Sequence, residues 1–143
     1  MIVEHKQAIL ARVKEDTLLA TCGFEGVVRP DPVTKKRPER YWTVFTDSGA
    51  RFTDRLAGAS NAATLMYWFH CVGVDPEQVQ KLDDRLITKL VDYTPTVPGY
   101  RPFRVRHVSS EPLRMDAEVR NESGEILHYS VNQFALTTQT IPA

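Results

Sequence analysis

The clearest pattern in the chain is an apolar run followed by an apolar stripe, in residues 65–91. Residues 65–72, LMYWFHCV, are largely apolar on both alternating faces, which is typical of a central strand. After Gly73, apolar residues recur at helical spacing: Val79, Leu82, Leu86, Ile87, Leu90 and Val91. Asp75 as N-cap, Pro76 in the first turn and Gln78 at a capping-box-like spacing predict where this helix begins. We expect the helix to pack on the strand before it, and another subunit to close the strand's second face.

Weaker patterns of the same kind predict the other elements. A helix is expected over residues 3–16. Strands are expected over residues 24–29, 41–47, 103–108, 113–119 and 126–136. Residues 94–102, TPTVPGYRP, cannot continue a helix because of their prolines. The order predicts an α+β fold: an antiparallel or mixed β-sheet with two main helices packed on one face.

Length and composition indicate an ordinary globular protein. The 143 residues suit a single domain, 1–143, and 18 Lys+Arg against 18 Asp+Glu give no indication of a nucleic-acid or membrane partner. No apolar run approaches the roughly 18 residues of a transmembrane helix, and the charged N-terminus is unlike a signal peptide. We therefore expect a soluble protein made in a cytoplasm. The distant Cys22 and Cys71 are expected to be reduced thiols.

Two segments lack a regular pattern. Residues 29–40, RPDPVTKKRPER, hold three prolines and five Lys/Arg, which predicts a surface loop that is either simply solvated or contacts phosphate. Residues 48–64 form a longer irregular stretch between two strands. Loops beyond about 12 residues are usually functional or disordered, so we interpret this one as an extended loop or arm, with a floppy loop as the alternative.

Charge is uneven along the chain. The 29–40 segment is basic, and Arg101, Arg104 and Arg106 form a second basic group. The last predicted hairpin is acidic through Glu111, Asp116, Glu118, Glu122 and Glu125. Opposite charges on different edges favour a head-to-tail contact between copies, which closes into a ring where the rotation allows. Chance asymmetry is the alternative.

The sequence holds no P-loop, GxGxxG, HExxH, CxxC or GxSxG motif. Adjacent residues on a strand face opposite sides, so His70 and Cys71 cannot share a metal ion, and a zinc site from the cysteines and distant histidines is disfavoured. Asp83 and Asp84 are expected on a solvated helix face. The remaining histidines are isolated and expected to be surface or sheet residues: His5, His107 and His128. We therefore expect no enzyme, no cofactor and no metal.

The element order and two stretches resemble a known family. YWTVFTDSGARFTDRLAG (residues 41–58) and FHCVGVDPEQVQKLDDRL (residues 69–86) look like tail terminator proteins of long-tailed (siphovirus) bacteriophages, of the actinobacteriophage type. The similarity spans nearly all of the chain, from the 3–16 helix to about Thr138. Residues 29–40 and 94–102 do not match a common pattern of that family.

The resemblance implies a structural role in the virion. Such proteins form a homohexamer ring on the head-proximal end of the tail tube, end tube polymerisation and join the tail to the head connector, with their sheets facing the ring interior. The implied partners are other copies, the tail tube protein and the head-to-tail connector protein, while DNA passes through the ring without specific binding. The implied location is the head–tail junction of the virion, after assembly in the host cytoplasm. The candidates for subunit or tube contacts are Arg51 and Arg55 in the arm, followed by Arg40 and Arg104.

Three other functions remain open at this point. The first is another head–tail connector or tail tube protein. The second is a small-molecule-binding or enzymatic α+β domain, which would hold a deep apolar pocket with converging polar groups. The third is a nucleic-acid binder, whose affinity would fall steeply with salt.

Overall fold

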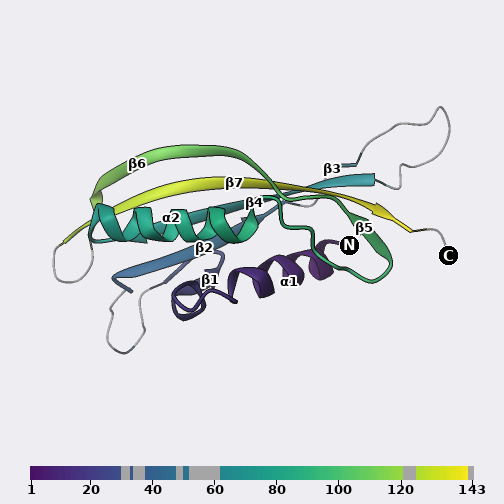
Figure 1. Ribbon diagram of the computed structural model, residues 1–143. Helices are drawn as coiled ribbons and strands as arrows, with labels where there is room; N and C mark the ends of the chain where they lie inside the picture. The colour runs from purple at the N-terminus through teal and green to yellow at the C-terminus, as the bar shows by residue number, and fades with distance from the viewer. Residues whose placement is uncertain (30–32, 34–37, 48–49, 52–61, 121–124, 142–143) are drawn as a thin grey trace.

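Two helices lie on one side of a mixed, curved β-sheet (Figure 1). The computed structural model describes residues 1–29, 33, 38–47, 50–51, 62–120 and 125–141. The helices are α1 (Ile2–Val13) and α2 (Pro76–Leu90), with a short 3-10 turn, η1 (Leu19–Thr21). The strands are β1 (Gly23–Glu25), β2 (Arg40–Thr46), β3 (Ala50–Arg51), β4 (Ala62–Gly73), β5 (Tyr100–Pro102), β6 (Arg106–Arg120) and β7 (Ile126–Thr140). This is the α+β fold that the sequence predicts.

The sheet is organised around β4. The strand order is β1-β2-β4-β7-β5, with β3 also beside β4 and β6 also beside β7. β1 and β2 run parallel, and each of the other pairs is antiparallel. The prediction of a central strand is therefore confirmed, and the sheet is of the mixed kind.

Helix α2 covers the middle of this sheet and contacts β2, β4, β6 and β7. Four residues of its apolar stripe are fully buried: Val79, Leu82, Leu86 and Leu90. Each such burial contributes about 1.5–3 kcal/mol before conformational entropy is subtracted. The Asp75 carboxylate accepts a hydrogen bond from the Glu77 N–H at 3.0 Å, as an N-cap should. The second half of the predicted capping box is absent, because Gln78 Oε1 is buried without a partner among the described residues.

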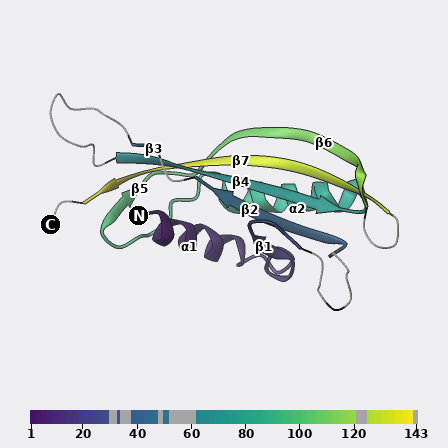
Figure 2. The same cartoon turned by 180° about the vertical axis from the view of Figure 1, so that it is seen from behind.

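The two faces of β4 have different surroundings. Leu65, Tyr67, Phe69 and Cys71 are buried beneath the helices. Met66, Trp68, His70 and Val72 are only half-buried on the opposite face. No helix of the described residues lies there, and Figure 2 shows the strands in front of α2 when the molecule is seen from behind. We call this second side of the sheet the open face.

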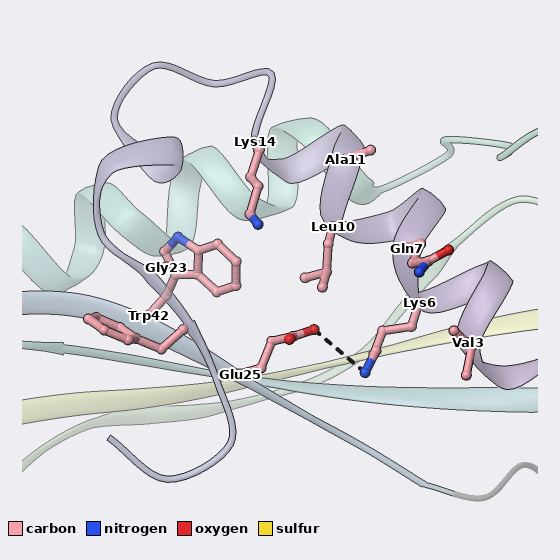
Figure 3. A pocket seen from close by; sticks show the side chains of 10 residues that line it. Val3, Lys6, Gln7, Leu10, Ala11, Lys14, Gly23, Glu25 and Trp42 are labelled. Atoms are coloured by element: carbon pink, nitrogen blue, oxygen red, sulfur yellow. Dashed lines mark ion pairs between the residues drawn. The ribbon is translucent and has the colours of Figure 1, made fainter. Parts of the chain in front are cut away.

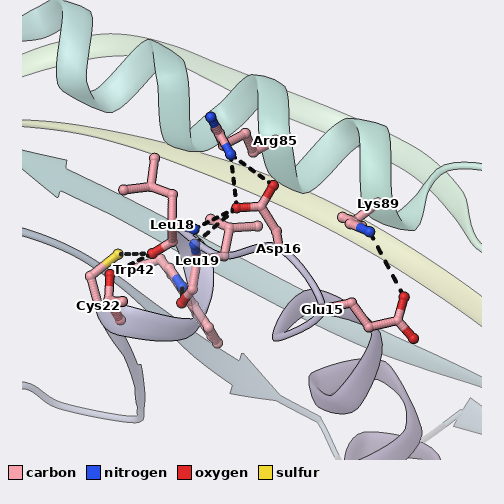
Figure 4. Close-up of polar contacts among 9 residues, drawn as sticks. Glu15, Asp16, Leu18, Leu19, Cys22, Trp42, Arg85 and Lys89 are labelled. Atoms are coloured by element: carbon pink, nitrogen blue, oxygen red, sulfur yellow. Dashed lines mark hydrogen bonds and ion pairs between the residues drawn. The ribbon is translucent and has the colours of Figure 1, made fainter.

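Helix α1 ends at Val13, earlier than predicted, because Asp16 organises a separate turn. The Asp16 Oδ1 atom accepts hydrogen bonds from the backbone N–H groups of Leu18 and Leu19, at 2.9 and 3.1 Å. The Arg85 guanidinium of α2 binds both carboxylate oxygens of Asp16, at 3.1 and 3.0 Å (Figure 4). Leu19 O in turn accepts the indole N–H of Trp42 at 2.8 Å. One carboxylate thus joins the turn after α1 to α2.

Several strand boundaries differ from prediction. β1 is shorter than residues 24–29, because Gly26 adopts a φ of 74° that extended strands do not use. The segment 94–102 contains β5, which was not predicted, and β7 extends four residues beyond the predicted Leu136. Part of the 48–64 arm is regular, since Ala50–Arg51 forms β3 and Ala62 begins β4; residues 52–61 lie outside the described residues.

The largest error concerns β6, which is one strand where the sequence predicts two. Its pairing with β7 shifts register between His107 and Ser109, between Glu111 and Arg114, and between Asp116 and Arg120. Each irregularity inserts residues that break the alternation of apolar and polar positions. The alternation of apolar and polar residues therefore stops although the strand continues.

The described helices include none long and apolar enough to cross a membrane.

The Asp16 contacts predict a specific loss of stability. In Asp16→Ala, two backbone N–H groups lose their acceptor and Arg85 loses its ion pair. We expect the free energy of unfolding to fall by about 1–2 kcal/mol. Chemical denaturation measures this value, with Asp84→Ala as the matched control because Asp84 is an exposed carboxylate on α2. Equal losses in the two variants would contradict the assigned role.

Candidate interaction surface

A groove of about 570 Å³ lies between α1 and β1 (Figure 3). Helix α1 contributes Val3, whose exposed fraction is 57%, and β1 contributes Phe24, with 40% exposed. Lys6 Nζ lies 3.5 Å from Glu25 Oε1, which joins the two walls by an ion pair. Lys14 also lines the groove and makes no ion pair with any described residue. We call this feature the α1–β1 groove.

The floor of the groove requires a glycine. Trp42 is buried, and its ring packs directly on the backbone of Gly23. A Cβ atom at position 23 would lie 2.1 Å from Trp42 Cζ2, which is far closer than van der Waals contact. Gly23 therefore makes room for the indole of Trp42.

β1 presents unpaired backbone groups along this groove. In its parallel pairing with β2, Trp42 N donates to Cys22 O and Gly26 N donates to Val44 O, both at 3.0 Å. Backbone groups of successive residues in a strand point to opposite sides, so residues 22, 24 and 26 bond β2. Gly23 and Glu25 therefore direct their N–H and C=O groups outward. No described strand pairs with that outer edge.

A polar network lies between α2 and the sheet. The Asp83 carboxylate accepts hydrogen bonds from Ser130 Oγ at 2.6 Å and from Asn132 Nδ2 at 2.6 Å, both on β7. Asn132 Oδ1 accepts a hydrogen bond from Ser110 Oγ of β6 at 2.6 Å and lies 3.2 Å from His107 Nε2. Burial raises the pKa of Asp83, although the bonds from Ser130, Cys71 and Asn132 oppose that rise. The expectation of a solvated Asp83 is wrong, and Asp84 is exposed as predicted.

The same network holds the outer strand β6 against β7. The exposed Ser110 and His107 lie 2.9 Å apart, a distance at which a histidine can activate a hydroxyl. Ser110 Oγ, however, donates its proton to Asn132 Oδ1, and the His107 ring lies against Phe134 with 5.1 Å between ring centroids. These contacts hold β6 against β7.

Three other titratable candidates are buried: His5, Cys22 and Cys71. His5 was expected at a surface or on the sheet, but it is fully buried on α1, with Nε2 2.8 Å from Thr138 Oγ1 of β7. Burial lowers the pKa of His5 and raises the pKa of both free thiols, Cys22 and Cys71. His70 and Cys71 face opposite sides of β4, as predicted. Within the described part of the chain, no group of His, Cys, Asp and Glu is placed to hold a metal ion.

Within the described residues, the predicted arginine candidates do not form one cluster. Arg40 is paired with Gly73 at one end of β4, and its Nε atom is buried without a partner among the described residues. The backbone of Arg51 pairs with Ala63 at the other end of β4. Arg104 lies 3.9 Å from Asp92, with both side chains 74% exposed. Arg55 lies outside the described residues.

Comparison with known proteins bears on the fold. No protein-family model matches the chain, and no curated protein matches its sequence significantly. Among solved structures, it is similar to a chain in the virion of a native gene transfer agent particle, with a TM-score of 0.63. The two chains share one fold. The match covers 92% of each chain at 14% sequence identity, so the likeness concerns the architecture and not individual residues.

The Asp83 network predicts a pH effect on stability. The folded protein holds the Asp83 proton more tightly than the unfolded chain, whose carboxyl has the ordinary pKa of 3.8. The contribution of Asp83 to stability is therefore largest at low pH and is lost as the pH rises through the folded pKa. We expect Asp83→Asn to lose less stability than the unmodified protein between about pH 4 and pH 7. Denaturation curves across that range test this, with Asp84→Asn as control; parallel profiles for Asp83→Asn and the unmodified protein would exclude the effect.

Proposed function

We propose that this protein is a virion structural protein that caps the head-proximal end of a phage tail tube as a ring. In this role it ends tube polymerisation and joins the tail to the head connector. The observation that carries the proposal is the fold shared, over 92% of both chains, with a chain of a gene transfer agent virion. The resemblance of residues 41–58 and 69–86 to tail terminator proteins supports the finer assignment.

The open face of the sheet supports an assembly made of several copies. Both helices lie on one face, and the open face carries half-buried apolar side chains such as Met66, Trp68 and Val72. Contiguous apolar surface on a small protein usually marks a contact with another molecule. A homohexamer ring in which the sheets face the interior would place these side chains against neighbouring copies or along the ring interior.

In the proposed role the protein binds other virion proteins and catalyses no reaction. A ring that matches the tail tube on one side and the head-to-tail connector on the other stops the tube because the next tube ring no longer finds its binding surface. The proposed partners are other copies, the tail tube protein and the connector protein, and DNA passes through without specific binding. The proposed site is the head–tail junction, reached after assembly in the host cytoplasm.

Another head–tail connector or a tail tube protein is the second candidate, because the shared fold supports a virion role in general. The two candidates differ in what the rings do. A terminator ring binds the end of a tube once, whereas tube rings stack on each other.

We expect the purified protein to bind cognate tail tubes as rings at one end. Mass measurement of the protein alone and with tubes gives the number of copies, and electron microscopy locates them. Rings that stack into tubes would identify a tube protein. A chain that stays monomeric at every concentration, with tubes present, would overturn the proposal.

The arm arginines provide a second test. Arg51→Glu combined with Arg55→Glu reverses two charges at the proposed subunit or tube contact, so we expect tail assembly and head joining to fail. The charge-preserving pair Arg51→Lys with Arg55→Lys is the control and should retain most assembly. Intact assembly in the Glu variant would show that these residues are not the contact.

A further inference from the structure

The two outer strands of the sheet run in opposite directions. β1 is parallel to β2, β2 is antiparallel to β4, β4 to β7, and β7 to β6. It follows that β6 is antiparallel to β1. In a head-to-tail ring each copy presents one surface to a different surface of the next. A sheet continued from copy to copy would therefore pair β6 with the neighbour's β1 as an antiparallel pair.

The strand registers also place the two edges at the same level. One cross-strand row on the open face runs through Phe24, Thr43, His70, Val131 and Glu111. A sheet that continues without a shift along the strands would place Glu111 of one copy beside Phe24 of the next. Residues opposite each other on antiparallel strands have Cβ atoms about 4.5–5.5 Å apart.

The lengths of the two edges agree as well. At the level of β1, the pairing of β6 with β7 keeps an unbroken register only over residues 109–111, between two register shifts. β1 is also three residues long. Bulges and edge prolines limit strand addition, and Pro112 follows directly on this short segment. With Glu111 opposite Phe24, this short segment meets β1 at Phe24 and Glu25, and Pro112 lies opposite Gly23.

The chemistry of the two edges is complementary. Gly23 and Glu25 direct backbone donors and acceptors into the α1–β1 groove, where the Lys14 ammonium has no described ion-pair partner. Glu111 is exposed and also forms no ion pair with a described residue. Residues 111–125 carry five acidic side chains against two arginines. With Glu111 opposite Phe24 its side chain lies on the open face, so the opposite charges attract the two edges without a direct pair between Glu111 and Lys14.

We propose that β6 of one copy adds to the outer edge of β1 in the next copy, with Glu111 opposite Phe24 and Ser110 opposite Glu25 at the α1–β1 groove. The occupant of the groove is a second copy of this chain. This inference rests on the proposed ring and names the two surfaces that build it.

A cysteine pair tests the contact in the full chain. Phe24→Cys combined with Glu111→Cys, oxidised in the assembled state, should give a ladder of covalent oligomers on a non-reducing gel. Each single variant should remain monomeric, because Cys22 and Cys71 are buried. The pair Phe24→Cys with Lys81→Cys is the geometric control, since Lys81 is exposed on α2. Cross-linking to the tail tube protein in place of a second copy would overturn the inference.

An edge-specific substitution provides the second measurement. Because the Glu25 N–H points away from β2, Glu25→Pro removes an outward donor and leaves the β1–β2 bonds in place. Glu25→Ala removes the same carboxylate and keeps the N–H. We expect the Pro variant to need about tenfold more protein than the Ala variant to form rings, at equal thermal stability. Equal assembly of the two would overturn the inference, and if the Pro variant does not fold, the cysteine pair decides.

The two proposals fail differently. If rings cap tubes but the cysteine pair gives no ladder of oligomers, the proposed β6–β1 contact is wrong and the proposed function stands. If the protein forms no rings, both the proposed function and the proposed contact are wrong.

Discussion

The structure depends on the packing of one amphipathic helix across the two central strands of a sheet. The buried stripe of α2 lies on β4 and β7, where Phe69 contacts Trp42 on one side and Phe134 on the other, with ring centroids 5.6 and 5.7 Å apart. α1 joins the same side through Asp16 and Arg85. Because both helices are used on that side, nothing helical in the described residues remains for the other. The open face is therefore a direct consequence of how the core is built.

The Asp83 network gives this packing a single alignment. Apolar stripes tolerate sliding, since most apolar contacts can be replaced by similar ones. The half-buried Asp83 carboxylate is different, because moving α2 by one turn would separate it from Ser130 and Asn132 and leave these two buried side chains without this partner. The same Asn132 also binds Ser110, so the alignment of α2 extends to the outer strand β6. The level of β6 relative to the rest of the sheet is thus fixed from the core.

The sequence predicts the elements whose patterns are local. The two apolar faces of β4, the N-cap at Asp75 and the stripe of α2 all follow from spacing within 30 residues or fewer. The sequence does not predict features that depend on contacts between residues far apart in the chain. Asp83 looked solvated beside Asp84, because its partner Ser130 lies 47 positions away. β6 seemed to be two strands because its bulges break the alternation, and the α1–β1 groove forms only where α1 meets an edge strand that no local pattern identifies.

Strand topology gives the uneven charge of the chain a physical meaning. In the chain, the basic segment 29–40 lies between β2 and β1, the strand at one edge of the sheet, and the acidic segment 111–125 begins on β6 at the other edge. A two-fold contact would place each edge against itself, basic beside basic or acidic beside acidic, which like-charge repulsion disfavours. A head-to-tail contact places opposite charges together at every interface. Under the proposed function, this charge distribution favours the head-to-tail contact, which can close into a ring, over the two-fold contact, which would stop at a dimer.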